Sequence, residues 1–172
     1  MTASSLPPLT LVLGGARSGK SSHAERLIVQ TRPPWVYIAT AEAGDGEMRE
    51  RIAHHRARRG DDWQTQEVPF ELAGAIAKLQ GEAALIDCLT LWLSNVLLAE
   101  RDVEAESERL IAALKAAPIP IVAVSNEVGL GIVPDTQLGR VFRDGQGRLN
   151  QQIAAIADRV ILMTAGLPLV LK

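Results

Sequence analysis

The sequence predicts an α/β fold with a mostly parallel central sheet flanked by helices. Short apolar runs of strand length recur along the chain, and segments of helical character separate them. The composition is 47% hydrophobic and 22% charged, which supplies a packed core and excludes disorder for the bulk of the chain. A length of 172 residues favours one domain. We expect a short polar leader at residues 1–8 and a single domain at residues 9–172.

Four mainly apolar runs predict strands that are buried in the sheet. They cover residues 9–13, 35–39, 83–87 and 119–125. Two terminal strands are expected at 159–164 and 168–171, and residues 63–68 fit a short strand at an edge of the sheet.

Helices are expected between these strands, at residues 20–30, 47–59, 71–79, 89–98, 103–115, 137–142 and 151–157. The segment 89–98 is apolar nearly all round, which predicts either a buried helix or one that forms an interface between subunits. The segment 103–115 is amphipathic and has an acidic outer face.

Charge and composition exclude several classes of protein. The formal net charge is −2, so no overall basic field favours nucleic acid or a membrane surface as partner. The one cysteine, Cys88, excludes an intrachain disulfide and a cysteine-cluster metal site, and it fits a reducing compartment. The chain has no run of 18 apolar residues, and its first residues lack the pattern of a signal peptide. We therefore expect a cytoplasmic protein without a membrane span.

The segment GGARSGKS at residues 14–21 matches the P-loop pattern, follows the first predicted strand and opens a helix. Its members are Gly14, Gly15, Ala16, Arg17, Ser18, Gly19, Lys20 and Ser21. Glycines let backbone N–H groups point at phosphate oxygens, and the helix N-terminus favours anions. Lys20 can reach the β- and γ-phosphates, and the Ser21 hydroxyl can ligate Mg²⁺. The alternative is a chance glycine-rich turn between a strand and a helix.

Asp87 ends the predicted strand 83–87. This is the position at which a P-loop enzyme places the acid that holds Mg²⁺, directly or through water. Ligands gather at the carboxyl ends of the strands in such an architecture. The alternative is an N-terminal cap for the helix that begins near Leu89.

Two adjacent histidines, His54 and His55, lie among five arginines within eleven residues. Helical spacing puts Arg51, His54 and Arg58 on one face. A neutral imidazole can attack phosphorus, and arginines bind phosphate oxygens, so the segment suits a covalent nucleotidyl step. The alternative is a solvated basic face that pairs with acidic residues at 42, 45, 47 and 50. A metal site is not expected, because adjacent histidines on a helix point in different directions.

Six segments together resemble one family in order and spacing. They are GGARSGKS, YIATAEAGDGEMRERIAHHRARR, DWQTQEVP, LIDCLTLWLSNVL, SNEVGLGIVP and FRDGQGRLNQ. The family is the bifunctional adenosylcobinamide kinase/adenosylcobinamide-phosphate guanylyltransferase of cobalamin biosynthesis. The resemblance extends from about Leu9 to the C-terminus. The P-loop is shared by many NTPases, whereas the histidine segment, NEVGLGIVP and GRLNQ are specific.

The resemblance implies a RecA-like P-loop NTPase fold and a homotrimer. It implies phosphorylation of adenosylcobinamide from a nucleoside triphosphate, ATP or GTP, and then GMP transfer from GTP through a GMP–histidine to give adenosylcobinamide-GDP. Mg²⁺ is the implied cofactor, and adenosylcobinamide and its phosphate are the implied partners, with no nucleic acid.

The same resemblance implies roles for individual residues. His54, which matches the first histidine of the family's pair, would carry the GMP, with His55 as the rival, and the P-loop with Lys20 would hold the phosphates. The remaining positions implied to contact the nucleotide or its metal are Ala39, Thr40, Ala41, His55, Arg56, Ala57, Arg58, Glu67 and Asp87. One departure is the segment AEAGDGE at residues 41–47, which carries two glycines where a more acidic run is expected.

Three other functions share the P-loop. A small-molecule kinase without guanylyl transfer explains the P-loop but gives no use to the histidine segment. A RecA-like ATPase that binds nucleic acid is disfavoured by the near-neutral charge and by the scarcity of aromatic residues for base stacking. A nucleotide sensor without catalysis is the third.

Overall fold

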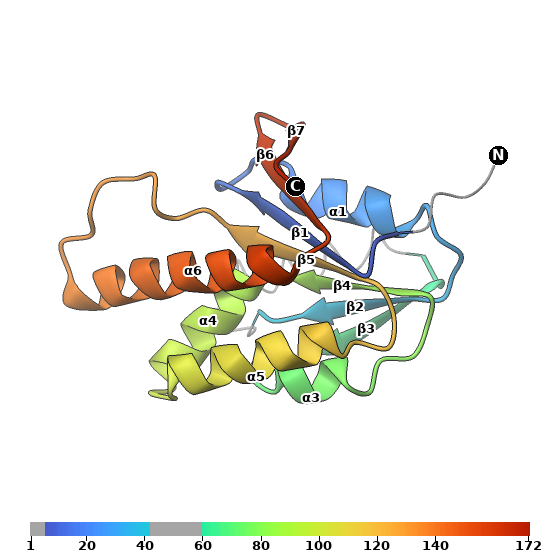
Figure 1. The fold of residues 1–172 in the computed structure, drawn as a ribbon, viewed down its shortest axis with the longest axis horizontal. Helices are drawn as coiled ribbons and strands as arrows, with labels where there is room; N and C mark the ends of the chain where they lie inside the picture. Colours follow the sequence, from blue (N-terminus) through green and yellow to red (C-terminus); the bar gives the residue numbers. More distant parts are fainter. Residues whose placement is uncertain (1–5, 42–59) are drawn as a thin grey trace.

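A seven-stranded sheet forms the centre of the computed structural model, which describes residues 6–41 and 60–172 (Figure 1). Its strands are β1 (Leu9–Gly14), β2 (Trp35–Ala39), β3 (Trp63–Glu67), β4 (Ala83–Asp87), β5 (Ile121–Asn126), β6 (Arg159–Thr164) and β7 (Leu167–Val170). They lie in the order β3-β2-β4-β5-β1-β6-β7. Neighbouring strands are parallel except β6 and β7, which are antiparallel. The mostly parallel sheet expected from the apolar runs is confirmed.

Helices cover both faces of this sheet. They are α1 (Lys20–Ile28), α3 (Leu72–Ile76), α4 (Leu89–Leu98), α5 (Val103–Lys115) and α6 (Gln137–Ile156). Helix α1 packs on one face, and α3, α4, α5 and α6 pack on the other (Figure 1). The carboxyl ends of the parallel strands meet at the left of Figure 1, where the loop between β5 and α6 also lies.

The alternation of side chains along the strands divides the apolar core into two clusters. Leu11 of β1 and Ala123 of β5 belong to the cluster under α3 to α6, whereas Val12 and Val124 belong to the cluster under α1. Each of these four side chains is at most 1% exposed. Burying one large aliphatic side chain contributes about 1.5–3 kcal/mol, so both faces of the sheet supply stability.

Helix α6 differs from the sequence-based expectation in its continuity, and α1 and α3 are shorter than expected. Helix α6 runs without a break for 20 residues, where two short helices were expected at 137–142 and 151–157. Gly145 and Gly147 favour a break, since glycine weakens a helix by about 1 kcal/mol. Gly145, however, packs where a Cβ would meet Leu93 at 3.7 Å, and Leu149 further along the helix is buried. Tertiary packing of this face outweighs the local preference for a break.

Helix α4 is buried within its own chain. Leu89, Trp92, Leu93 and Val96 are each at most 1% exposed, and the helix packs against α5, α6 and β5. Leu98 at its end is 66% exposed. Of the two expectations for this apolar segment, the structure supports the buried helix.

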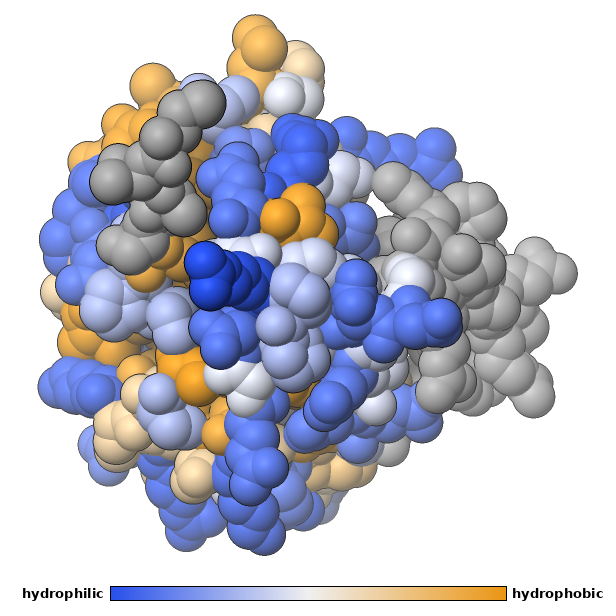
Figure 2. Space-filling model, turned by 90° about the vertical axis from the view of Figure 1, so that its right-hand side faces the viewer, coloured by the Kyte–Doolittle hydropathy of each residue, from blue (hydrophilic) through white to orange (hydrophobic). Residues whose placement is uncertain are grey.

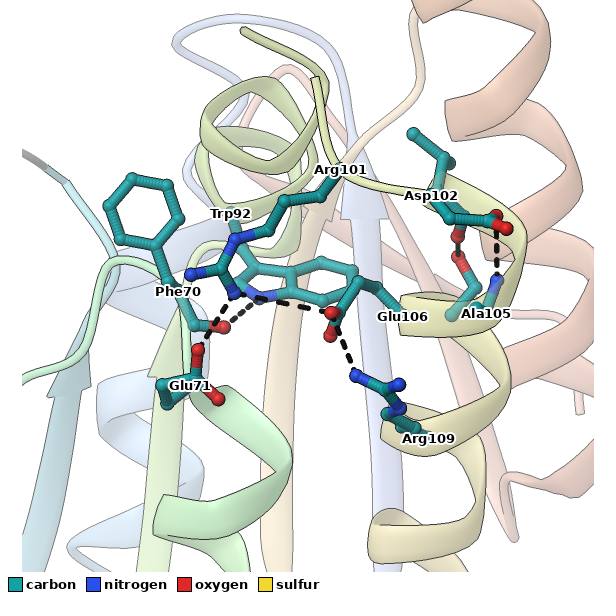
Figure 3. Close-up of polar contacts among 10 residues, drawn as sticks. Phe70, Glu71, Trp92, Arg101, Asp102, Ala105, Glu106 and Arg109 are labelled. Carbon is teal, nitrogen blue, oxygen red and sulfur yellow. Dashed lines mark hydrogen bonds and ion pairs between the residues drawn. The ribbon is translucent and has the colours of Figure 1, made fainter. Parts of the chain in front are cut away.

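A polar cluster at the end of α4 holds the segment that follows β3 (Figure 3). Trp92 Nε1 donates to the carbonyl of Phe70 at 2.9 Å, and the Arg101 guanidinium lies 4.9 Å from the centre of the Phe70 ring. Arg101 also pairs with Glu71 at 2.7 Å. Half-exposed ion pairs contribute about 1 kcal/mol or less, so the buried indole and its hydrogen bond are the stronger restraint.

The face turned toward the amino ends of the strands is mainly hydrophilic, with apolar groups gathered toward one edge (Figure 2). Among the described residues, no helix is long and apolar enough to cross a membrane.

Candidate active site

The P-loop joins the carboxyl end of β1 to the start of α1, as the sequence predicts. Its backbone has positive φ angles at Gly14 (153°), Arg17 (55°) and Gly19 (92°). A Cβ on Gly14 would lie 2.6 Å from the carbonyl oxygen of Met163 and from Ser18 Oγ. Glycine is therefore required at position 14 by close contact, and the loop turns tightly enough to present backbone N–H groups at the N-terminus of α1.

Lys20 opens α1 and is 8% exposed. Its Nζ donates a hydrogen bond to the carbonyl of Gly15 at 2.5 Å. Burial lowers the pKa of the Lys20 ammonium below its usual range, and the nearby acidic groups of Cys88 and Asp87 oppose that shift. The P-loop lysine is thus held over the loop, within electrostatic reach of the end of β4.

Asp87 lies at the carboxyl end of β4, beside Ala39 of β2 and Val124 of β5. Tyr37 Oη donates a hydrogen bond to Asp87 Oδ2 at 3.0 Å. Ala83 and Leu85, four and two residues earlier, pack in the α1 cluster, so the Asp87 side chain points to that same face of the sheet. The N-cap of α4 is Cys88, one residue later, so the alternative role of Asp87 as the cap does not fit its position.

Thr40 links the ends of β2 and β4. Its Oγ1 donates to the carbonyl of Cys88 at 2.6 Å and accepts from Cys88 N at 2.8 Å. Its backbone N donates to the carbonyl of Asp87 at 3.3 Å, and its carbonyl accepts from Asn95 Nδ2 at 2.8 Å. Thr40 is fully buried, and its polar groups bind within the chain, so its geometry suits positioning of Asp87 better than direct contact with a ligand.

Of the other residues predicted to contact the nucleotide, some lie within the described residues and some lie outside them. Ala39 is buried at the end of β2, Ala41 is half-buried two residues later, and Glu67 is exposed at the end of β3 beside Ala39. Ala39 adjoins Asp87, and Glu67 lies one strand further along the same edge of the sheet. The expected helix at 47–59, with His54, His55, Arg56, Ala57 and Arg58, lies outside the described residues.

The structure shows a buried polar cluster to which the sequence alone assigns no role. Asn150 Oδ1 of α6 accepts from Ser125 Oγ at 2.7 Å and from Gln146 Nε2 at 2.9 Å, and all three residues are buried. Asn150 Nδ2 also donates to the carbonyl of Asn126 at 3.0 Å. The available signal was the spacing of Gln146 and Asn150, which puts two amides on one face of a helix beside the polar end of a strand.

The donors at this edge fit Mg²⁺. A hydroxyl at Ser21 and a carboxylate at Asp87 are hard oxygen ligands, which Mg²⁺ prefers. No group of three metal-ligating side chains occurs in residues 6–41 and 60–172. Two protein donors leave coordination positions for phosphate oxygens and water, which is typical of Mg²⁺ that binds together with a nucleotide.

Comparison with solved structures supports the fold. The flagellar accessory protein FlaH from Methanocaldococcus jannaschii superposes with a TM-score of 0.55 at 14% identity, covering 97% of this chain and 79% of FlaH. The RadB recombinase gives a TM-score of 0.52 at 15% identity, covering 91% and 74% of the two chains. At such identities the likeness concerns the fold alone, and it confirms the RecA-like P-loop architecture.

Comparison of sequences is closer. The bifunctional adenosylcobalamin biosynthesis protein CobP of Pseudomonas aeruginosa is 49% identical over 166 residues, covering 94% of this chain and 96% of that protein. The corresponding protein CobU of Salmonella typhimurium is 41% identical over 181 residues, covering 95% and 99%. The family model described as cobinamide kinase / cobinamide phosphate guanyltransferase matches residues 10–171. The chain therefore belongs to the cobinamide kinase / cobinamide phosphate guanyltransferase family.

Proposed function

We propose that this protein phosphorylates adenosylcobinamide and then transfers GMP from GTP to the product, giving adenosylcobinamide-GDP in cobalamin biosynthesis. The observation that carries the proposal is the match of the family over residues 10–171, together with a P-loop after β1 and Asp87 at the end of β4, on either side of β5 at the same edge of the sheet. The adenosyl form of the substrate and the use of ATP or GTP in the first step are parts of this proposal.

The kinase step uses the P-loop edge of the sheet. Backbone N–H groups of residues 14–21 and the N-terminus of α1 bind the phosphates, and Lys20 reaches the β- and γ-phosphates. Ser21 and Asp87 would hold Mg²⁺, which would neutralise charge on the phosphates. The hydroxyl of the corrinoid side chain attacks the γ-phosphorus, the bond to the β-phosphate oxygen breaks, and the hydroxyl proton is lost to solvent.

The transferase step uses the histidine segment. The His54 imidazole attacks the α-phosphorus of GTP, a P–N bond forms, and pyrophosphate leaves. A phosphate oxygen of the phosphorylated corrinoid then attacks the same phosphorus, and the P–N bond breaks. Arg56 and Arg58 neutralise phosphate charge during both steps. The support for this half comes from the histidine–arginine pattern and the family, since the segment lies outside the described residues.

One nucleotide site serves both reactions in this proposal. The sequence contains one P-loop pattern, and a single domain at residues 9–172 would carry both activities. We further propose a homotrimer located in the cytoplasm, on the basis of the family resemblance. Size-exclusion chromatography with light scattering tests the trimer.

Two substitutions test which residues are needed for each of the two reactions. His54→Ala should abolish formation of adenosylcobinamide-GDP but retain phosphorylation of adenosylcobinamide, because phosphoryl transfer needs the P-loop and not a covalent histidine. Lys20→Ala should impair both reactions. His55→Ala is the matched control for the nucleophile. Survival of both activities in His54→Ala would refute the histidine assignment, and intact guanylyl transfer in Lys20→Ala would require a second GTP site.

The second candidate is a small-molecule kinase without guanylyl transfer, which the described P-loop geometry by itself also fits. It predicts phosphorylation of adenosylcobinamide with no GMP transfer in the wild-type protein under any nucleotide condition.

A further inference from the structure

The position of Asn126 in the sheet brings it close to both parts of the proposed nucleotide site. It ends β5, which lies between β4 with Asp87 and β1 with the start of the P-loop. Asn126 is in register with Gly14, and Val124 is in register with Asp87. Asn126 therefore stands at the edge where the strand ends converge, between the two parts of the proposed nucleotide site.

The alternation along β5 sets the direction of the Asn126 side chain. Val122 and Val124 pack in the cluster under α1, whereas Ile121 and Ala123 pack in the cluster on the opposite face. Because side chains alternate, Asn126 points to the α1 face. This is the face on which the P-loop helix and the Asp87 side chain lie.

Hydrogen bonds fix the backbone of Asn126 on both sides. Its N donates to Thr90 Oγ1 at 2.7 Å, and its carbonyl accepts from Asn150 Nδ2 at 3.0 Å. The next residue, Glu127, donates its N to the carbonyl of Gly14 at 3.1 Å. Within the described segments the side-chain amide of Asn126 makes no hydrogen bond. The fold thus holds this residue in place and leaves its amide for another partner.

The opposite face explains how Asn126 is held. Ser125 points toward α6 and binds Asn150 at 2.7 Å, and Gln146 donates to Ser125 at 2.8 Å. Ser125 and Gln146 are fully buried, and Asn150 is 5% exposed. Gln146 Nε2 donates to both Ser125 and Asn150, so the three side chains hold one another and fix the end of β5 against α6, although Gln146 Oε1 has no hydrogen-bond partner among the described residues.

We propose that the Asn126 amide donates a hydrogen bond to the terminal phosphate of the nucleoside triphosphate in the P-loop, with Asn150 as its positioning residue. The inference rests on the proposed nucleotide site and adds a residue that distinguishes a triphosphate from a diphosphate. A neutral N–H donor suits this position because Lys20 already supplies the positive charge. Removing such a donor weakens binding only where the terminal phosphate is present.

Binding measurements with matched analogues test this inference. The α,β-methylene analogues of GTP and GDP resist cleavage at the α-phosphorus, so titration calorimetry in Mg²⁺ measures binding alone. Asn126→Ala should lose about tenfold in affinity for the triphosphate analogue and keep its affinity for the diphosphate analogue, since a hydrogen bond to a charged group is lost. Asn126→Asp, which has the same shape, should lose more because it places a negative charge beside the phosphate.

Two further variants distinguish a positioning role of Asn150 from general destabilisation of the protein. Asn150→Leu should show a smaller loss that is again confined to the triphosphate analogue, with unchanged affinity for the diphosphate analogue. Gln152→Ala, which removes an exposed amide on the same helix, should bind both analogues as the wild type does. An unchanged ratio of the two affinities in Asn126→Ala and Asn126→Asp would overturn the inference while leaving the proposed function intact. Failure of the wild-type protein to bind either analogue would overturn both.

Discussion

The phenolic hydroxyl of Tyr37 donates a hydrogen bond to Asp87 Oδ2 at 3.0 Å and so joins the carboxyl ends of β2 and β4. Tyr37 is 5% exposed, so its hydroxyl is held against the Asp87 carboxylate by the surrounding core. One oxygen of Asp87 is thereby oriented by the protein, while the carboxylate keeps capacity for a metal ion or its water.

Tyr37→Phe should raise the half-saturating Mg²⁺ concentration for phosphorylation of adenosylcobinamide by about tenfold, since partners of metal ligands contribute about that much to metal affinity. A Mg²⁺ titration of the kinase rate measures the effect. Trp63→Phe is the control, because it changes the aromatic ring that lies 6.2 Å from Tyr37 and keeps the hydroxyl. Equal Mg²⁺ dependence in Tyr37→Phe and the wild type would show that this hydrogen bond does not serve the metal.

Thr40→Val should destabilise the protein by about 2–4 kcal/mol, because two hydrogen bonds are lost and the buried Cys88 N–H is left without its partner. Urea unfolding measures the change. Thr40→Ser keeps the hydroxyl and should retain most of the stability. If the valine variant is as stable as the serine variant, the link between β2 and β4 does not depend on this hydroxyl.

Gly14→Ala and Gly147→Ala should change stability in opposite directions. At Gly14 the added Cβ lies 2.6 Å from a backbone oxygen at a φ of 153°, so we expect a loss of about 1–3 kcal/mol and impaired nucleotide binding. At Gly147 nothing lies within 4 Å, so alanine should stabilise α6 by about 0.5–1 kcal/mol. Thermal melting of the two variants compares them, and a shift of the same sign in both would contradict the account of α6.

Lys20→Met should reveal the lowered pKa of Lys20 through the pH dependence of stability. The folded-state pKa lies below the ordinary value of 10.5, so the unfolded chain binds more protons between the two values. The free energy of unfolding of the wild type should therefore rise relative to Lys20→Met as pH increases through that window. Urea unfolding at several alkaline pH values measures the difference, and a constant or falling difference would contradict the burial of this charge.

The sequence predicts the sheet and the P-loop well, because both depend on local patterns. The apolar runs of β1, β2 and β4 predict buried strands from the local sequence alone. The glycines of residues 14–19 predict the P-loop in the same way. The prediction of two short helices in place of α6 was wrong, because the packing of Gly145 against Leu93 cannot be seen in the local sequence. Residue-level propensity is overridden wherever distant segments meet.

The supporting residues of the site were harder to foresee for the same reason. Tyr37 and Asp87 are 50 residues apart, and Thr40 and Cys88 are 48 apart. Their contacts exist only because β2 and β4 are neighbours in the sheet. The position of Asp87 at the end of β4 was predictable, because an acid that ends an apolar strand is a local signal. The contact of Thr40 with the nucleotide stays a prediction, and the structure adds the hydrogen bonds of its hydroxyl to Cys88, which the sequence did not indicate.

Covalent labelling tests the central claim most directly. The wild-type protein is incubated with Mg²⁺ and GTP radiolabelled at the α-phosphate, then denatured and digested. We predict an acid-labile, base-stable label on the peptide that contains His54 and His55, absent in His54→Ala and present in His55→Ala. GTP binding without any such label in the wild type would contradict the guanylyl-transfer half of the account and leave a P-loop kinase.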